Sequence, residues 1–600
     1  MRLGVKKTPK GYQFAYANAK EEPCTLLLYK KGAKEPELEL PMSRKMGDIF
    51  EVHVEKINAK QYEYVYCVGE KVVLDPYAKG ISGKKKFGEP VELSELRCTF
   101  DCSEYNWEDD KHPEIPFSES LIYCTHLRGY TMDKSSKVRA KGTFKGMIEK
   151  IPYLVSLGVK QLELMPVYEF EEFPRPKKKN DQYEQEVPME NLKLNYWGYT
   201  EGFYFAPKSS YAYGNDAAKE FKDLVKALHK AGIELILEFY FPETTAPHLV
   251  MDCLKYWVSE YHIDGIHINR SALPMKNLVM EPALKSTKIF TEYFDSSELV
   301  EESKLPKRKH LAEYHEGFLI DARRLLKGEE DVLRAFAEKT KRNPQTHGIV
   351  NYMANHNGFT MMDMVSYDEK HNEANGENNR DGSDYNYSWN GGVEGPSKKK
   401  QLILLRAKQL RNAFAMLMFA QGIPLIYGGD EFCNSQQGNN NAYGQDNEIS
   451  WIQWNTGKEA KSLLEYVKEL IAFRNAHGAL HMQKEAVQAD YKSTGMPDLS
   501  FHSENAWYGG FEAYRRHIGM MYGAGYAEGE KNAIYVAYNL HQSEHAFGLP
   551  ILGKGRKWKL IFNTAGEEQY FTPEGVEISD QKILKMQGRS ICVLEGMSDE

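Results

Sequence analysis

Polar residues stand at the ends of several apolar segments in the middle of this chain. Glu238 lies in IELILEFYF, Asn269 ends IDGIHIN, Glu292 lies in KIFTEYF, and His356-Asn357 follows HGIVNYMAN. Hydrolysis of a glycosidic bond with retention needs a nucleophilic carboxylate and an acid/base carboxyl about 5–5.5 Å apart. Glu292 has the right chemistry for one of them. The amide of Asn269 carries no charge and is a poor nucleophile.

The elements that must position these residues alternate between strand and helix. From residue 121 onward, near-continuous apolar segments of strand length alternate with segments of helical periodicity that often end in glycine. Such strands form a parallel sheet covered on both faces. Their number favours a closed (β/α)₈ (TIM) barrel, in the α/β class, over residues 110–480. Chemistry is then expected at the C-terminal ends of the strands.

The two ends of the chain show a different pattern of apolar and turn residues. Residues 1–100 contain short alternating segments separated by turn residues, and residues 485–600 contain similar ones, so a β-sandwich is expected on each side of the barrel. Tyr62, Tyr64 and Tyr66 share one face of a strand. A flat aromatic face can stack on glucose, but burial against the barrel is the favoured role.

Composition excludes several classes of function. The net charge is −8, which disfavours nucleic acid as a partner. We find no signal peptide and no run of about 18 apolar residues, so no membrane association is expected. The eight cysteines are scattered, which favours reduced thiols in a cytoplasmic protein. Residues 372–390 lack EF-hand spacing, and we expect neither a metal nor a cofactor.

Longer motifs in this chain resemble those of a known protein family, and the resemblance extends over nearly all of residues 10–600. The chain resembles the α-amylase superfamily (glycoside hydrolase family 13), and within it the glycogen-debranching, isoamylase and pullulanase branch. The N-terminal segment then resembles that branch's glycogen-binding module. The matching segments are LDPYAKG (74–80), NYWGYTEGFYFAPKSSYA (195–212), the stretch 355–396 and the stretch 428–454.

The chain departs from the family at the positions that do the chemistry. Where the family carries Arg-x-Asp after the fourth strand, this chain has His267-Ile268-Asn269, so the nucleophile position is an amide. The family's His-Asp after the seventh strand is His356-Asn357 here, so the stabiliser is an amide too. The third-strand motif lacks its Asn-His, and only residues 242–248 replace the loop that usually follows. Glu292 still occupies the general-acid position.

The resemblance also suggests which residues contact sugar. The candidates for stacking on glucose or donating a hydrogen bond to it are Tyr196, Trp197, Tyr199 and His356. Aromatic residues that follow a barrel strand, however, often only cover the hydrophobic core. His267 is placed with them, but filling the space of the family's arginine is the favoured role. For Glu292, a retained polar residue at a strand end is the favoured role over a working acid.

Three functions remain open at this stage. The favoured one is a family-13 protein of α-glucan metabolism that binds branched α-glucan or maltodextrin without hydrolysing it, as a glucan-binding or regulatory subunit. An active debranching paralogue is then the expected partner. The alternatives are an active α-1,6-glucan hydrolase with atypical catalytic residues, and a scaffold that does not bind sugar.

Overall fold

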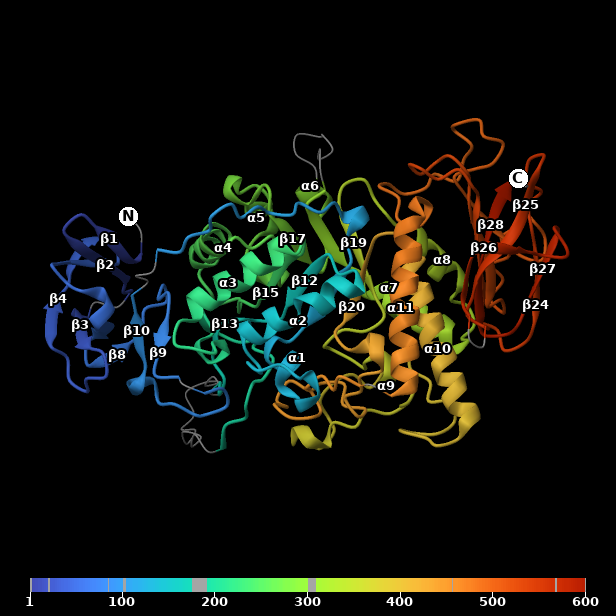
Figure 1. Cartoon of the computed structure of the whole chain (residues 1–600). Helices are drawn as coiled ribbons and strands as arrows, with labels where there is room; N and C mark the ends of the chain where they lie inside the picture. The colour runs from blue at the N-terminus through green and yellow to red at the C-terminus, as the bar shows by residue number, and fades with distance from the viewer. Residues whose placement is uncertain are drawn as a thin grey trace.

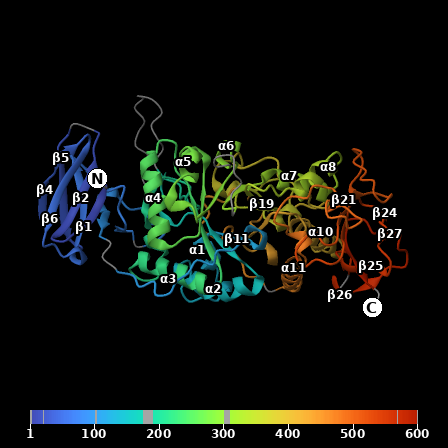
Figure 2. The same ribbon diagram turned by 90° about the horizontal axis from the view of Figure 1, so that it is seen from above.

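The computed structural model describes residues 3–19, 22–84, 86–100, 104–174, 191–299, 309–455, 457–566 and 569–598. Two β-sandwiches flank a central barrel on opposite sides, which gives an elongated molecule (Figures 1 and 2). Within the described residues, no helix has the length and apolarity needed to cross a bilayer.

The N-terminal part consists of two packed antiparallel sheets. One is ordered β1 (Gly4–Thr8), β2 (Gly11–Ala17), β6 (Ile49–Glu55) and β5 (Ser43–Met46). The other is ordered β4 (Leu38–Pro41), β3 (Cys24–Lys30), β7 (Tyr62–Val68), β10 (Arg97–Thr99) and β9 (Ile81–Ser82), with β8 (Lys71–Val73) beside β7. The bulky inward-facing side chains of both sheets form their shared core.

Tyr64 and Tyr66 of β7 are core residues, as expected, but of the sandwich rather than of its contact with the barrel, and the half-buried Tyr62 packs against that core. Tyr64 and Tyr66 are fully buried among the apolar side chains of both sheets, and their hydroxyls donate to Asp75 at 2.9 and 3.5 Å. Tyr77 makes the contact with the barrel, because its ring stacks on Phe205 at 4.8 Å. The face that could have stacked on glucose is therefore occupied by the protein's own core.

Eight parallel strands close into the predicted barrel. They are β11 (Ile122–Thr125), β12 (Gln161–Leu164), β15 (Glu234–Phe239), β16 (Gly265–Ile268), β17 (Lys288–Thr291), β18 (Leu311–Tyr314), β19 (Gly348–Tyr352) and β20 (Ile423–Tyr427). Nearly every residue in them is buried, which explains their continuous apolar character. The sixth strand, β18, is only four residues long and was not identified from the sequence.

Helices cover the outside of the barrel (Figure 1). A representative one, α2, begins after Thr143, whose side chain accepts from the Gly146 N–H, and ends at Gly158 with φ +91°. The helices are α1 (Leu127–Met132), α2 (Phe144–Leu157), α3 (Ala217–Lys230), α4 (Pro247–Tyr261), α5 (Met275–Val279), α6 (Ser296–Leu299), α7 (Glu316–Lys327), α8 (Leu333–Lys341), α9 (Met361–Met364), α10 (Lys400–Met418) and α11 (Lys458–Ala476). A hairpin of β13 (Tyr168–Phe170) and β14 (Gly202–Pro207) is inserted after β12.

The C-terminal part is again built of two sheets around their own core. The larger one is ordered β21 (Leu499–His502), β22 (His517–Tyr522), β23 (Ile534–Asn539), β28 (Ser590–Ser598), β25 (Arg556–Asn563) and β26 (Phe571–Glu577). The smaller pairs β24 (His545–Gly548) with β27 (Ile583–Met586). Trp558, Tyr535 and Phe547 are buried between them.

Candidate functional site

Asn269, which the resemblance predicts to stand at the nucleophile position, holds the ends of two neighbouring strands together. It follows β16, and Phe241 lies two residues beyond β15. The Phe241 N–H donates to Asn269 Oδ1 at 2.9 Å, and Asn269 Nδ2 donates to the Phe241 carbonyl at 2.9 Å and to Ser271 Oγ at 2.9 Å. Both ends of the amide are thus engaged. The arrangement needs one donor and one acceptor, and a carboxylate supplies no donor.

Glu292, predicted by the resemblance as the general acid, lies on the exposed rim of the barrel directly after β17. Its carboxylate accepts hydrogen bonds from the backbone N–H of Arg270 at 3.1 Å and from the Thr291 hydroxyl, Oγ1, at 2.7 Å. The guanidinium of Arg270 is held in turn by the side chains of Asp295 and Glu298. Glu292 is therefore accessible and oriented by local contacts.

Asn357, which the resemblance predicts at the stabiliser position, is exposed, and its backbone N–H donates to Asn355 Oδ1 at 3.1 Å. The neighbouring His356 turns inward. Its ring stacks on Tyr199 at 5.0 Å and meets Trp197 edge-on at 5.0 Å. Burial, followed by the positive charge of His267, lowers the pKa of His356 to about 3. His356 is therefore neutral at neutral pH and can both donate and accept a hydrogen bond.

The floor of the barrel mouth is a group of two buried carboxylates and a half-buried histidine. His267 Nδ1 lies 2.7 Å from Glu163 Oε1 and 3.9 Å from Glu238 Oε2. Burial alone lowers the pKa of His267, but the hydrogen bond and charge of Glu163 outweigh it and raise that pKa. Burial, followed by the charge of Glu163, raises the pKa of Glu238 to about 7. His267 balances charge here, and its side chain remains 21% exposed at the mouth.

Tyrosines close over this group from two sides. Tyr199 donates its O–H to Glu238 Oε2 at 2.6 Å, and Tyr314 donates to Glu163. The Tyr314 ring also stacks on His267 at 4.2 Å. Glu238 is consequently only 5% exposed. Its carboxylate is held from above by Tyr199 and from the side by His267.

Sequence reasoning missed Glu163 and Tyr314. Glu163 had a readable signal, since it is the one charged residue in the apolar segment QLEL of β12. Tyr314 had none, because its strand was not recognised. Cys124, on β11, was also missed, and its thiol donates to Glu238 Oε1 at 3.5 Å.

The same group has donor atoms that suit a metal ion. Cys124, Glu163 and Glu238 each place one ligand atom within 4.8 Å of the others. In this structure the three side chains are engaged with one another, with His267 and with the two tyrosines. Their arrangement is thus accounted for by hydrogen bonds within the protein.

Tyr196 corrects one expectation. Its ring is 1% exposed and lies against His126 at 3.9 Å, so it offers no face to a sugar. The next residue, Trp197, is also largely buried, at 7% exposure, but it lines the hollow at the mouth. Of the expected sugar-contacting residues, the structure brings Trp197, Tyr199 and His356 together.

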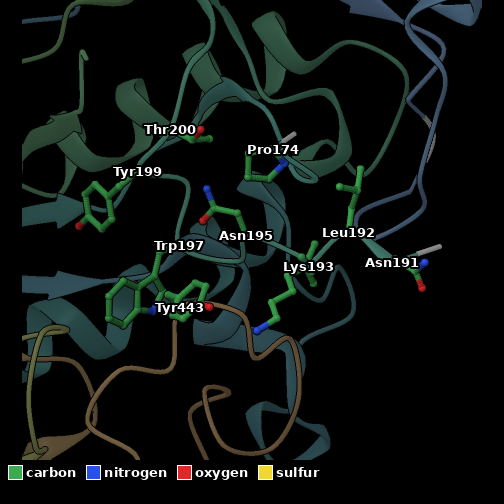
Figure 3. Close-up of a pocket in the computed structure, with 10 residues that line it drawn as sticks. Pro174, Asn191, Leu192, Lys193, Asn195, Trp197, Tyr199, Thr200 and Tyr443 are labelled. Carbon is green, nitrogen blue, oxygen red and sulfur yellow. The ribbon is translucent and has the colours of Figure 1, made fainter. Parts of the chain in front are cut away.

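A hollow of about 570 Å³ opens beside these residues. Trp197 and Tyr199 line it together with Tyr443, whose ring meets that of Trp197 edge-on at 6.4 Å (Figure 3). Lys193 and Asn195 add polar groups to the wall. Aromatic faces combined with a few polar groups are typical of small-molecule sites. Tyr443 was not singled out from the sequence, although it lies in the motif 428–454.

Comparisons with known proteins agree with this architecture. Residues 2–78 match the family described as carbohydrate-binding module 48 (isoamylase N-terminal domain). Isoamylase 3 of rice, a chloroplastic protein, is 30% identical over 97% of this chain and 84% of its own length. The glycogen operon protein GlgX homolog of Haemophilus influenzae is 32% identical over 69% of this chain and 73% of its own length.

Among solved structures, a pullulanase of Paenibacillus barengoltzii in complex with maltohexaose and α-cyclodextrin shares the fold with a TM-score of 0.71. It is 19% identical, and the match covers 100% of this chain and 95% of that one. The eight-stranded barrel, the N-terminal module and relatives of at least 30% identity agree. The chain belongs to the glycogen-debranching and isoamylase branch of glycoside hydrolase family 13, a family of α-glucan metabolism.

Proposed function

We propose that this protein binds α-glucan at the barrel mouth without hydrolysing it, and acts as a glucan-binding or regulatory subunit beside an active debranching protein. The observation that carries the proposal is the pairing of the Asn269 amide with both backbone polar groups of Phe241. The side chain at the nucleophile position is therefore committed to joining two strands. It is neither charged nor free to attack a sugar.

The magnitude of the expected defect is large. A retaining mechanism forms a covalent glycosyl-enzyme intermediate on a carboxylate. Loss of one essential member of a catalytic unit lowers the rate by roughly 10⁴–10⁶-fold. The exposed amide of Asn357 at the stabiliser position adds to this loss. Glu292 alone can protonate a leaving group but provides no nucleophile.

An active enzyme with an atypical nucleophile is the second candidate, and Glu238 is the carboxylate that it would use. Glu238 lies in the barrel mouth, and with a pKa of about 7 part of it is ionised at neutral pH, which is the form that a nucleophile needs. Against this, Tyr199 and His267 enclose the carboxylate, and its exposure is 5%. A glucose ring would reach it only after Tyr199 had moved.

Sugar binding is favoured over a scaffold role by the hollow beside Trp197. Its wall combines three aromatic side chains with Lys193 and Asn195. The related pullulanase was solved with maltohexaose and α-cyclodextrin, which are α-glucans. A scaffold without sugar affinity has no need of aromatic side chains that converge on an open hollow.

Electrophoresis in gels containing glycogen, together with a sensitive reducing-end assay on the same preparation, tests the proposal. We expect retardation of the wild-type protein, loss of retardation in Trp197→Phe combined with Tyr443→Ala, and no reducing ends above the blank. Tyr213→Ala is the matched control, because Tyr213 is exposed but lies outside this hollow. Turnover of about 1 s⁻¹ on glycogen or pullulan, an ordinary enzyme rate, would overturn it.

The subunit role needs its own experiment. Addition of the protein to an active isoamylase should change the elution volume of that enzyme on a sizing column, or its rate on amylopectin. The Trp197→Phe/Tyr443→Ala variant shows whether an effect on the rate comes from glucan binding or from assembly alone. If assembly persists while the rate effect is lost, glucan binding carries the regulation. If the wild-type protein changes neither, the regulatory part of the proposal fails.

A further inference from the structure

The segment between β21 and β22 presents a group of exposed aromatic side chains, and we call residues 503–516 the C-terminal aromatic loop. Trp507 is 52% exposed, Tyr508 54% and Tyr514 61%. Three large aromatic side chains are thus exposed to solvent within eight residues. Exposed apolar groups of this kind mark binding sites. The barrel mouth does not include them.

The loop is held firmly on its own domain. The Gly548 N–H in β24 donates to the Ser503 carbonyl at 2.8 Å. A Cβ on Gly548 would stand 2.3 Å from the Ala506 nitrogen, so only glycine allows the loop to lie this close. Trp507 adopts φ +69°, a conformation that a bulky residue rarely takes, and its N–H donates to His502 Nδ1 at 2.8 Å.

The loop is also attached to the barrel. The Asp331 N–H donates to the Ala513 carbonyl at 2.8 Å, and Arg516 pairs with Glu330 at 2.8 Å. Both acidic residues lie between α7 and α8. The aromatic side chains are therefore displayed from a fixed backbone, which lowers the entropic cost of binding a ligand to them.

Charged groups stand among the aromatic rings. Arg515 pairs with both Glu504 and Glu512, and Glu512 Oε1 also accepts from the Tyr508 O–H at 3.3 Å. The Arg515 guanidinium lies 5.6 Å from the centre of the Tyr514 ring. Aromatic residues and arginine are enriched in protein–protein interfaces, but glutamate, of which this loop has two beside the rings, is depleted there. Flat apolar faces beside oriented carboxylates and a guanidinium suit a ligand with both an apolar face and many hydroxyls, which is a sugar.

We propose that the C-terminal aromatic loop is a second α-glucan-binding site, in which Trp507 and Tyr514 stack on glucose rings and the Glu504–Arg515–Glu512 group binds their hydroxyls. The choice of α-glucan as the ligand follows from the chain's family. It does not depend on whether the barrel mouth binds sugar. The site would hold a glucan chain to the C-terminal domain independently of the barrel.

Fluorine NMR of the full-length protein labelled with 5-fluorotryptophan tests this, because Trp507→Phe and Trp197→Phe assign the two resonances of interest. We expect the Trp507 resonance to shift on titration with millimolar maltoheptaose. Tyr514→Ala should weaken the apparent affinity reported by Trp507 about tenfold, the equivalent of one lost stacking contact. Tyr385→Ala is the matched control and should change nothing, because Tyr385 is a 79% exposed tyrosine on a barrel loop.

The outcomes separate the two sites. If the Trp197 resonance shifts while that of Trp507 stays fixed, the second site is refuted and binding at the barrel mouth stands. If Trp507 shifts and Trp197 does not, the second site stands and binding at the mouth fails. If the Trp507 resonance responds to protein concentration but not to maltoheptaose, the loop is a self-association surface and the inference is wrong.

Discussion

The Asn269 side chain and the Phe241 backbone form a reciprocal pair of 2.9 Å hydrogen bonds between the ends of β16 and β15. Replacement of the amide by a carboxylate would put two oxygens against each other at the Phe241 carbonyl. Asn269→Asp should therefore lower the free energy of unfolding by about 1–3 kcal/mol, the cost of leaving a buried group unsatisfied. Urea titration measures this, with Asn357→Asp as the control, because Asn357 is exposed and its substitution should be nearly neutral.

The hydrogen bonds between Asn269 and Phe241 also limit how much activity the return of acidic residues can restore. Asn269→Asp together with Asn357→Asp recreates the acidic residues of the family, yet we expect little or no cleavage of pullulan. The carboxylate at 269 would still lie against Phe241, and displacement of a reacting group by about 1 Å is costly in rate. Pro242-Glu243 also replaces the family's Asn-His in the third-strand motif. Activity near that of an active isoamylase in the reducing-end assay would contradict this expectation.

Glu238 should make stability depend on pH. Burial and the charge of Glu163 raise its pKa from 4.5 to about 7 in the folded protein. The folded state therefore holds a proton that the unfolded state releases, and stability is lost as the pH rises between these values. Glu238→Gln removes this effect, so its stability relative to wild type should increase from about pH 4.5 to about pH 7 and then level off.

Urea unfolding at several pH values measures the difference between Glu238→Gln and wild type. The control repeats the comparison in a Glu163→Gln background, where the pH dependence should shrink because one cause of the raised pKa is gone. A difference that stays constant across the range would show that Glu238 has an ordinary pKa.

Tyr196 and Tyr199 should respond differently to the loss of a hydroxyl. The Tyr196 hydroxyl is buried, and among the described residues it has no hydrogen-bond partner, so Tyr196→Phe should be neutral or slightly stabilising. Tyr199→Phe removes the 2.6 Å hydrogen bond to buried Glu238 and should cost about 1–3 kcal/mol. Thermal unfolding of the two variants provides the comparison. Equal effects would mean that the Tyr199 contact adds nothing.

The N-terminal tyrosines should matter for stability and not for sugar binding. Tyr64→Phe removes a 2.9 Å hydrogen bond to buried Asp75, whereas Tyr66→Phe removes only a 3.5 Å contact. We expect Tyr64→Phe to be the more destabilising, by about 1–2 kcal/mol. Neither variant should change retardation in a glycogen gel, because both rings are buried. Reduced retardation of a fully folded variant would place glucan contacts in the sandwich.

The sequence by itself determined the barrel, and it predicted amides at two positions where the family resemblance places catalytic carboxylates. Alternating strands and helices are local patterns, and burial on both faces leaves the strands visible as apolar runs. The amides at 269 and 357 were found because long flanking motifs fix their alignment with the family. The weakest local signal was that of β18, whose four residues Leu311–Tyr314 are too few to show a period.

Only the tertiary structure decided what these side chains contact. Asn269 and Phe241 are 28 residues apart, and His267 and Glu163 are 104 apart, so no local pattern connects them. Strand register in the closed barrel brings both pairs together. Tyr196 and Trp197 are equivalent aromatic residues in the sequence and both are buried, at 1% and 7% exposure, but only Trp197 lines the hollow. Local periodicity sets which elements form, whereas closure of the barrel sets which side chains meet.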